Sequence, residues 1–297
     1  MNRSRSLATA RTPPARPARR AAVVTSIALL VLAALSNPAS AETVVRVPGL
    51  QGLGTPTWHQ LHSEKLDRGF HLFVKTPGDL APDARVPVVY LLDGGRWFPV
   101  LAGYYDGLRF EERLGDVVLV AISYGAEGFR DGNLRSTDYT APAQEVDYWG
   151  GAGAYLQVLE TELMPFVEAR HPQADPTRRV VFGHSLGGQF VLYAALHAPQ
   201  VFRTHISSNP ALHRNLDHFL DTPLPESVDS ALFVADARDD DPVFAAPRQQ
   251  WLAAMRARDE LPWAYEVRAL PGESHLSSTP AAFLHGLRWS LEQMENR

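Results

Sequence analysis

Residues 178–196 read RRVVFGHSLGGQFVLYAAL, and this stretch decides the fold class. Its first part is a short apolar run that predicts a strand, and its last part has the pattern of a helix. Between them, Gly183-His184-Ser185-Leu186-Gly187 matches Gly-x-Ser-x-Gly, which forms a nucleophile elbow when it joins a strand to a helix. We expect Gly183 and Gly187 to let strand and helix approach closely around a strained turn that exposes the Ser185 hydroxyl.

The rest of the chain alternates short apolar runs with helical patterns. The apolar runs predict buried strands at 70–74, 86–92, 117–123, 179–182, 204–208, 231–235 and 265–270. Helical spacing predicts helices at about 101–114, 152–170, 186–198, 247–260 and 280–295. Strands separated by helices of this length imply right-handed crossovers. We therefore expect an α/β fold in which helices flank a doubly wound, mostly parallel sheet, with the long segment 124–151 as the lip of a pocket.

Residues 1–41 have the order of an export signal. They contain six arginines and no acidic residue, and the apolar stretch 21–35 has about the length of a signal-peptide core. Ala39-Ser40-Ala41 then supplies the small-x-small pattern of a cleavage site. We expect cleavage before Glu42, and a single domain, 42–297, that is periplasmic or secreted and has no stable membrane anchor. An uncleaved N-terminal anchor is the alternative.

Composition excludes several classes of function. The absence of cysteine excludes disulfide scaffolds, thiol catalysis and cysteine-type zinc sites. Without residues 1–41, the chain keeps 22 basic and 33 acidic residues, a net charge of −11, because all six arginines of that segment leave with it. Such an acidic body is a poor nucleic-acid binder. No metal or cofactor is expected, and the sequence leaves the oligomeric state open.

A serine nucleophile needs a base and an acid, which follow it in this chain order in folds with such an elbow. His275 is the best base, because it lies in a turn-rich loop between the last predicted strand and the closing helix. The acid must follow the strand 231–235, where four aspartates compete: Asp236, Asp239, Asp240 and Asp241. Aligning the loop with Gly-x-x-Asp-x-x-Val favours Asp240, with Asp239 and Asp236 behind it. A dyad without an acid stays open.

Main-chain N–H groups and polar or aromatic side chains complete the predicted site. The loop after strand 86–92 reads DGGRW, and we expect an oxyanion hole made by the Leu186 N–H and that of Gly95 or Arg96. Four residues are candidates for substrate binding: Trp97, Arg135, His184 and His213. An arginine such as Arg135 is more often solvated or salt-bridged than bound to substrate, and the His184 side chain is expected to point away from the turn.

Five stretches carry a resemblance to a known family: YLLDGGRWF (90–98), RSTDYTAP (135–142), GGAGAYLQVLETELMPFVEARHP (150–172), RRVVFGHSLGGQFVLYAAL (178–196) and GESHLSS (272–278). Together they resemble the esterase family of α/β-hydrolases, which includes siderophore esterases such as enterochelin and salmochelin esterases, S-formylglutathione hydrolases, feruloyl esterases and mycolyltransferases. The first four look most like the siderophore-esterase branch. The resemblance implies the α/β-hydrolase fold, Ser185 as nucleophile and His275 as general base. Relatives often carry aromatic residues where His213 and Arg214 stand here.

These observations together predict an exported serine esterase. It would hydrolyse a small-molecule carboxylic ester through an acyl-enzyme, with siderophore-type esters among the candidates. Acetylated sugars, feruloyl esters and short lipids are also compatible with the sequence. Two alternatives stay open: an acyltransferase on the same scaffold, and a catalytically degenerate hydrolase that acts as a binding protein.

Overall fold

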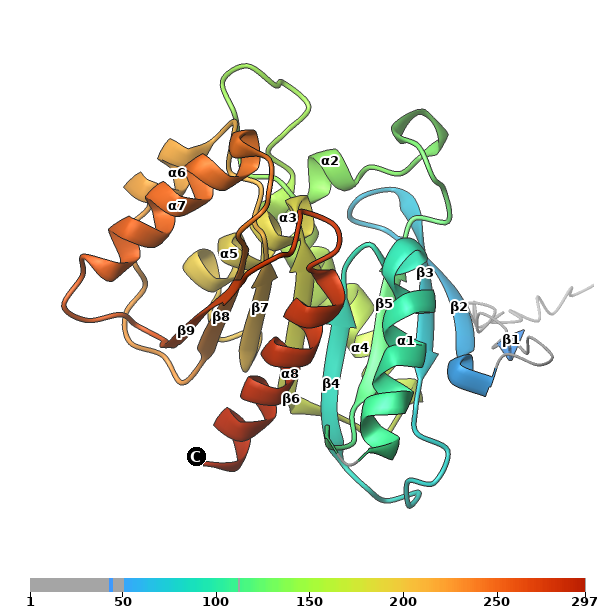
Figure 1. Ribbon diagram of the computed structural model, residues 1–297. Coiled ribbons are helices and arrows are strands. Elements are labelled where there is room, and N and C mark those ends of the chain that lie inside the picture. The colour runs from blue at the N-terminus through green and yellow to red at the C-terminus, as the bar shows by residue number, and fades with distance from the viewer. Residues whose placement is uncertain (1–42, 45–50, 112, 297) are drawn as a thin grey trace, which may run out of the picture. The chain divides into compact units, whose positions relative to one another are not determined.

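The computed structural model describes residues 43–44, 51–111 and 113–296, and these residues form one nine-stranded sheet (Figure 1). The predicted signal peptide, 1–41, and its cleavage site before Glu42 lie outside the described residues. In spatial order the strands are β1 (Thr43–Val44), β2 (Thr57–Ser63), β3 (Arg68–Lys75), β5 (Val118–Ser123), β4 (Val86–Leu91), β6 (Ala174–His184), β7 (Thr204–Ser208), β8 (Ala231–Ala237) and β9 (Ala264–Leu270).

The strand directions confirm the predicted mostly parallel sheet. From β5 to β9 all neighbouring strands are parallel, whereas β1, β2 and β3 are antiparallel to their neighbours. All residues of the central strands β4 and β5 are buried. Such strands have both faces covered, and this is why they appear in the sequence as continuous apolar runs rather than as an alternating pattern.

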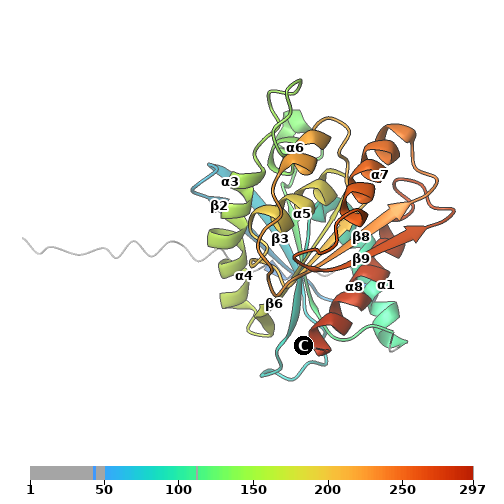
Figure 2. The same ribbon diagram turned by 90° about the vertical axis from the view of Figure 1, so that its left-hand side faces the viewer.

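Helices cover both faces of the sheet (Figures 1 and 2). One face packs against α1 (Gly94–Phe110) and α8 (Thr279–Glu295). The other face packs against α5 (Leu186–His197) and a long helix made of α3 (Ala152–Val158), the π-helical turn η3 (Leu159–Leu163) and α4 (Met164–Arg170). On this second face, α6 (Leu216–Asp221) and α7 (Pro242–Arg256) cover β8. The short pieces are η1 (Gln51–Leu53), η2 (Phe129–Asp131) and α2 (Arg135–Asp138).

Several elements differ from the sequence prediction, and the short helices α2 and α6 and strand β1 were not predicted at all. Helix α1 begins at Gly94 rather than near residue 101, and α7 begins at Pro242 rather than at 247. Glycine and proline disfavour a helix interior but are tolerated in its first turn, so these starts were hidden in the sequence. Strand β2 was not predicted, because its polar sequence TWHQLHS lacks an apolar run. Its register is set by pairing along its whole length with β3.

Candidate active site

The nucleophile elbow joins β6 to α5, as the sequence predicts. Ser185 has a φ of 61°, a left-handed conformation that costs a non-glycine residue roughly 1–3 kcal/mol. Its N–H donates to the carbonyl of Ser208 on the neighbouring strand, at 2.9 Å, and this bond holds the turn. The serine therefore stands at the carboxyl end of a central parallel strand, where α/β sheets place their ligands.

Close backbone approach around the elbow requires two glycines, and one of them differs from the prediction. A β-carbon on Gly183 would lie 2.2 Å from the carbonyl oxygen of Gly187, and one on Gly188 would lie 2.7 Å from that of Ser208. A β-carbon on Gly187 would meet nothing closer than 3.5 Å. Glycine is thus sterically required at 183 and 188, whereas Gly187 contributes only its backbone to the close approach.

His275 lies between Ser185 and Asp240. Its Nε2 is 2.9 Å from Ser185 Oγ, and its Nδ1 is 2.9 Å from Asp240 Oδ2. Because a carboxylate can only accept a hydrogen bond, Nδ1 carries the proton and Nε2 is left to accept from the serine hydroxyl. The three side chains come from the loops after β6, β8 and β9, at the same edge of the sheet.

The other three predicted aspartates have different positions: Asp236 lies on β8, and Asp239 and Asp241 lie between β8 and α7. Asp236 is buried and bonds to Arg248, Asp241 caps α7 by accepting from the Val243 N–H, and Asp239 is exposed. None of these three is hydrogen-bonded to His275 among the contacts of the described residues. The geometry therefore favours the aspartate that the Gly-x-x-Asp-x-x-Val alignment selected.

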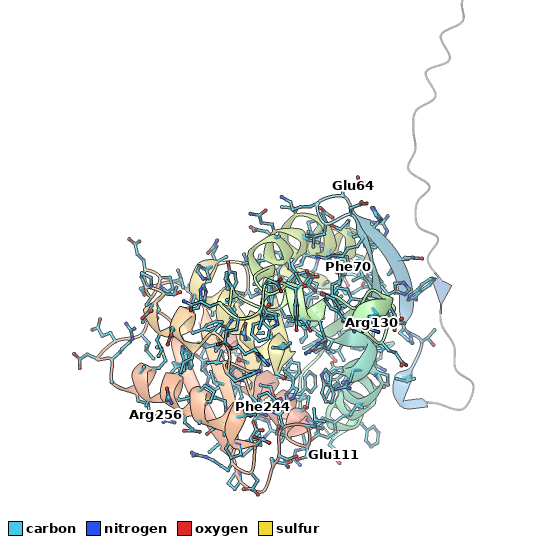
Figure 3. All side chains as sticks on the ribbon, turned by 90° about the horizontal axis from the view of Figure 1, so that it is seen from above. Glu64, Phe70, Glu111, Arg130, Phe244 and Arg256 are labelled. Atoms are coloured by element: carbon cyan, nitrogen blue, oxygen red, sulfur yellow. The ribbon has the colours of Figure 1, made fainter. Side chains whose placement is uncertain are left out.

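Two aromatic rings enclose the imidazole of His275. Phe244, labelled in Figure 3, stacks on it with ring centroids 4.5 Å apart and an interplanar angle of 20°. The ring of His184 lies 4.9 Å away, and its Nδ1 is 3.1 Å from Ser208 Oγ. Burial, followed by the nearby His275 and three arginines, lowers the pKa of His184 well below its ordinary value. His184 is therefore neutral at neutral pH. It lines the pocket beside Ser185, so the expectation that it points away from the turn is wrong.

The oxyanion donors are placed by the first turns of α5 and α1. The Leu186 N–H opens α5 and has no carbonyl four residues back to bond within the helix. Gly95 lies in the first turn of α1 and lines the same cavity as Ser185. The Arg96 N–H already donates to the carbonyl of Asp93, at 2.9 Å. Of the two predicted alternatives, Gly95 is thus the better placed donor, and Arg96 contributes its side chain to the cavity instead.

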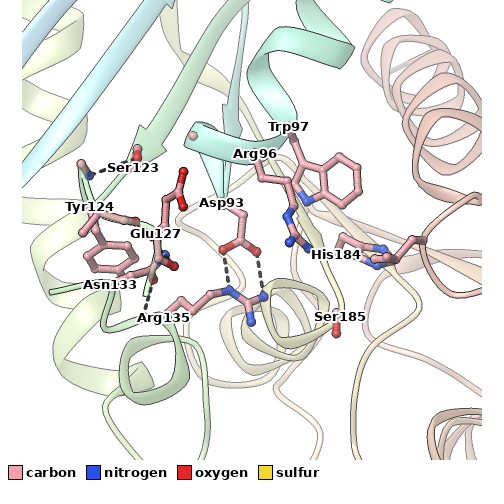
Figure 4. Close-up of a pocket in the computed structure, with 14 residues that line it drawn as sticks. Asp93, Arg96, Trp97, Ser123, Tyr124, Glu127, Asn133, Arg135, His184 and Ser185 are labelled. Atoms are coloured by element: carbon pink, nitrogen blue, oxygen red, sulfur yellow. Dashed lines mark hydrogen bonds and ion pairs between the residues drawn. The ribbon is translucent and has the colours of Figure 1, made fainter. Parts of the chain in front are cut away.

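Arg135 is engaged with Asp93, the residue that precedes α1 (Figure 4). Its Nε and Nη2 donate to the two carboxylate oxygens of Asp93, at 2.6 and 2.8 Å. Asp93 has a φ of 54°, and its N–H donates to the Tyr139 hydroxyl. The segment after β5 therefore holds the loop that carries Gly95. Arg135 lines the cavity, as predicted for a binding residue, but its guanidinium is bound by a protein carboxylate.

A cavity of about 660 Å³ opens in front of Ser185. Its walls come from the loop after β4, from the start of the segment 124–151 and from the loop of His275; they include Trp97, Tyr124, Glu127, Asn133 and Leu276. The segment 124–151 thus forms one lip of the pocket, as predicted. His213 is not among the lining residues. It packs edge-on against Phe244 and Trp149, with centroids 5.0 and 6.0 Å apart, so its predicted contact with substrate is not supported by its position.

No sequence motif pointed to Arg248 or Phe244 as site residues. Arg248 is fully buried on α7 and donates both to Asp236 Oδ1 at 2.9 Å and to Asp240 Oδ2 at 2.7 Å. One signal was present in the sequence: Phe244, Arg248, Trp251 and Met255 follow one another at helical spacing, which places the arginine on the apolar side of α7. An arginine at such a position needs a buried anionic partner.

Two further features bear on the class of site. Within the described ranges, no three or more histidine, aspartate or glutamate side chains gather in a way that would bind a metal ion. A membrane-spanning helix is likewise not found in the part of the chain that the structure describes.

Comparison with known proteins places these features among esterases. The family model described as "Putative esterase" matches residues 63–266. The ferri-bacillibactin esterase BesA of Bacillus subtilis is 33% identical over 185 residues, which are 54% of this chain and 62% of that protein. The chain spans less than two thirds of the length of this and the next curated relatives, which include the siderophore triacetylfusarinine C esterase of Aspergillus fumigatus.

Solved structures show the same fold. The BES protein from Bacillus cereus superposes with a TM-score of 0.70 at 20% identity, over 84% of this chain and 98% of that chain. The enterobactin and salmochelin hydrolase IroE superposes with a TM-score of 0.61 at 26% identity, over 78% and 93% of the two chains.

Proposed function

The chain belongs to the esterase family, and on that premise we propose that it is a serine carboxylic-ester hydrolase that works through an acyl-enzyme. The observation that carries this proposal is the position of His275, 2.9 Å from both Ser185 Oγ and Asp240 Oδ2. A binding protein has no need of a serine, a histidine and a carboxylate in this relay. The neutral His184 against His275 adds no second positive charge beside the base.

In the proposed first half-reaction, Ser185 Oγ attacks the ester carbonyl while its proton passes to His275 Nε2. Asp240 holds the imidazole by its Nδ1–H and stabilises the imidazolium that forms. The N–H groups of Leu186 and Gly95 donate to the carbonyl oxygen as it becomes negative. The tetrahedral intermediate then collapses, the bond to the alcohol oxygen breaks, and His275 returns the proton to the leaving alcohol.

In the second half-reaction a water molecule takes the place of the alcohol. His275 Nε2 accepts a proton from the water as its oxygen attacks the acyl carbon, and the same N–H groups hold the oxyanion. The bond to Ser185 Oγ breaks, the serine regains its proton, and the carboxylic acid leaves. The cavity in front of Ser185 gives both the ester and the water access to the nucleophile.

We propose a siderophore-type ester as the substrate class. The names of the curated relatives support it, because they describe esterases of ferri-bacillibactin and of other siderophores. The cavity is compatible with a large polar ester, since Arg96, Glu127 and Asn133 line it together with Trp97. Export is part of the same proposal and rests on the Arg-rich, apolar, Ala-x-Ala order of residues 1–41. N-terminal sequencing of the mature protein tests it, with Glu42 as the expected first residue.

A substrate panel tests the function. The purified protein is incubated with p-nitrophenyl esters of increasing acyl length and with a ferric tri-catecholate ester. We expect a burst of p-nitrophenol equal to the enzyme concentration if the acyl-enzyme accumulates, and faster turnover of the catecholate ester. Absence of hydrolysis of every ester would reject the proposed activity. Steady hydrolysis of the p-nitrophenyl esters without turnover of the catecholate ester would reject only the proposed substrate class.

A further inference from the structure

A fully buried arginine contacts the carboxylate of Asp240 on the side away from solvent. Arg248, on α7, donates from Nη1 to Asp240 Oδ2 at 2.7 Å, from Nε to Asp236 Oδ1 at 2.9 Å and from Nη2 to the carbonyl of Ala237 at 3.0 Å. Its side chain has 0% exposure, as do those of both aspartates. The planar fork of the guanidinium thus spans the two carboxylates and the end of β8.

The same oxygen of Asp240 accepts both hydrogen bonds. Oδ2 accepts from Arg248 Nη1 and from His275 Nδ1, whereas the buried Oδ1 has no hydrogen-bond partner among the residues that the structure describes. Rotation of the carboxylate away from this orientation would break the hydrogen bond from the buried guanidinium to Oδ2, so Arg248 opposes it. The bond from Arg248 therefore determines where the imidazole of His275 finds its acceptor.

We propose that Arg248 is a positioning residue that orients Asp240 toward His275 and, by its charge, weakens the pull of this carboxylate on an imidazolium. Asp236 is the second part of the arrangement, because it neutralises Arg248 and holds its other edge. This inference rests on the proposed function, in which His275 must gain and lose a proton in each half-reaction.

The buried charges around Asp240 determine in which direction each variant should shift the protonation of His275. Asp236 and Asp240 are two buried anions that share one buried cation, and desolvated charges without a partner are strongly destabilising. When Asp236 alone is removed, the positive charge of Arg248 is neutralised by Asp240 only. Asp240 then stabilises an imidazolium less, and protonation of His275 is disfavoured. When Asp236 and Arg248 are removed together, Asp240 has only His275 as a partner, and protonation of His275 is favoured. The two changes should therefore shift the pH dependence of the reaction in opposite directions.

The other charged and titratable groups around His275 stay the same in these variants. His184 lies against the ring, His213 lies behind Phe244, and Arg96 and Arg135 stand across the cavity. Arg238 reaches Asp236 Oδ2 at 3.3 Å from the surface, with 48% of its side chain exposed. Because its charge is screened by water, Arg238 offers a matched control for Arg248.

The experiment compares wild type, Asp236→Asn, Asp236→Asn/Arg248→Gln and Arg238→Gln. The first measurement is kcat/KM for a p-nitrophenyl ester between pH 4.5 and 9. We expect the midpoint of the acid limb to move down in Asp236→Asn and up by about one pH unit in the double variant, with little change in Arg238→Gln. Midpoints that move in the same direction, or that do not move in folded variants, would overturn the proposal.

A second measurement does not depend on activity. The NMR resonance of the His275 Nδ1 proton reports its hydrogen bond to Asp240, and its titration is followed in the same four proteins. If the wild-type protein hydrolysed no ester, the proposed function would be rejected. If this proton titrated in the double variant as it does in wild type, the role of Arg248 would be rejected.

The conservative variant Arg248→Lys covers the case in which the double variant does not fold. It keeps the charge and loses the fork, so we expect kcat to fall roughly tenfold with KM unchanged and with the acid limb in place. Wild-type kcat in Arg248→Lys would show that the fork does not orient Asp240.

Discussion

Arg135 donates two parallel hydrogen bonds to the carboxylate of Asp93, at 2.6 and 2.8 Å. This pair connects the segment after β5 to the loop that begins α1. Asp93 has the left-handed conformation that a non-glycine residue adopts only at a cost, and Gly95 follows two residues later. A bidentate pair has a fixed geometry, so the contact holds the loop of Gly95, the proposed oxyanion donor, relative to Ser185.

Arg135→Lys tests this relationship. A lysine keeps the charge but offers no planar fork, so the loop of Asp93 and Gly95 loses its fixed position. We expect kcat/KM on a p-nitrophenyl ester to fall roughly 10- to 100-fold, mainly through kcat. Arg130→Lys is the matched control, because Arg130, labelled in Figure 3, is an exposed arginine on η2. Equal activity of the two variants would show that the pair does not position the oxyanion donor.

Ser185→Ala should abolish ester hydrolysis while the protein stays folded. Alanine keeps the β-carbon at the strained turn, so stability changes little, whereas the covalent step disappears. His275→Ala should be similarly damaging, and the double variant should lose little more than either single variant, because the two residues act as a unit. A serine-directed phosphonate should label wild type at Ser185 and not the alanine variant. Activity above about a tenth of wild type, a barrier change of about 1.4 kcal/mol or less, would exclude Ser185 as the nucleophile.

Asp240→Asn should lower kcat more than a change at either exposed aspartate nearby. An amide in place of the carboxylate favours the wrong tautomer of His275 and leaves the imidazolium without a counter-charge. We expect a loss of roughly 100- to 10,000-fold. Asp239→Asn and Asp241→Asn are the controls, since Asp239 is exposed and an asparagine at 241 can still cap α7. Equal activity of all three variants would show that Asp240 is not the acid, or that the enzyme works as a Ser–His dyad.

Gly183→Ala and Gly187→Ala should differ sharply although both residues belong to the same motif. A β-carbon at Gly183 would lie 2.2 Å from a backbone oxygen, so we expect a loss of about 3 kcal/mol or more and a Tm lower by roughly 5–10 °C. A β-carbon at Gly187 meets nothing closer than 3.5 Å, so its Tm should change by less than about 2 °C. Differential scanning calorimetry compares the two, and equal destabilisation would contradict the steric account.

His205 should make the fold sensitive to acid. It is fully buried on β7, and burial lowers its pKa from 6.5 to about 4. Between these values the unfolded chain binds a proton at His205 that the folded chain does not. The contribution of His205 to the free energy of unfolding is therefore fully present above pH 6.5 and is lost as the pH falls towards 4. The shift corresponds to about 3 kcal/mol of unfolding free energy. Urea titrations at pH 7.5 and 4.5 should show a smaller acid-induced loss in His205→Gln. An identical loss in wild type and variant would assign the acid sensitivity to other groups, such as His184.

Local patterns in the sequence were sufficient for much of the fold. Seven strands and the helices α5 and α8 were predicted close to their observed positions, because buried strands and amphipathic helices leave periodic signals. Strand β2 left no such signal, since its polar residues are ordered by pairing with β3. The start of α1 was also missed, because glycine disfavours a helix interior and two glycines follow Asp93; in the structure, Asp93 is hydrogen-bonded to Arg135 and Tyr139.

For the site, too, some residues could be predicted from local sequence and others only from tertiary contacts. Ser185 and His275 stand in short motifs whose chemistry is recognisable from neighbouring residues alone, and their chain order already pointed to a Ser–acid–His relay. Four aspartates lie between residues 236 and 241, and only the fold separates their roles: Asp240 is hydrogen-bonded to His275, while Asp236, on β8, is bonded to Arg248. The roles of Arg135 and Arg248 likewise depended on the tertiary structure. The role of a charged side chain depends on its ion-pair partner. The partner of Arg135 lies 42 residues away in the sequence, and the partners of Arg248 lie on the preceding strand β8 and the loop after it.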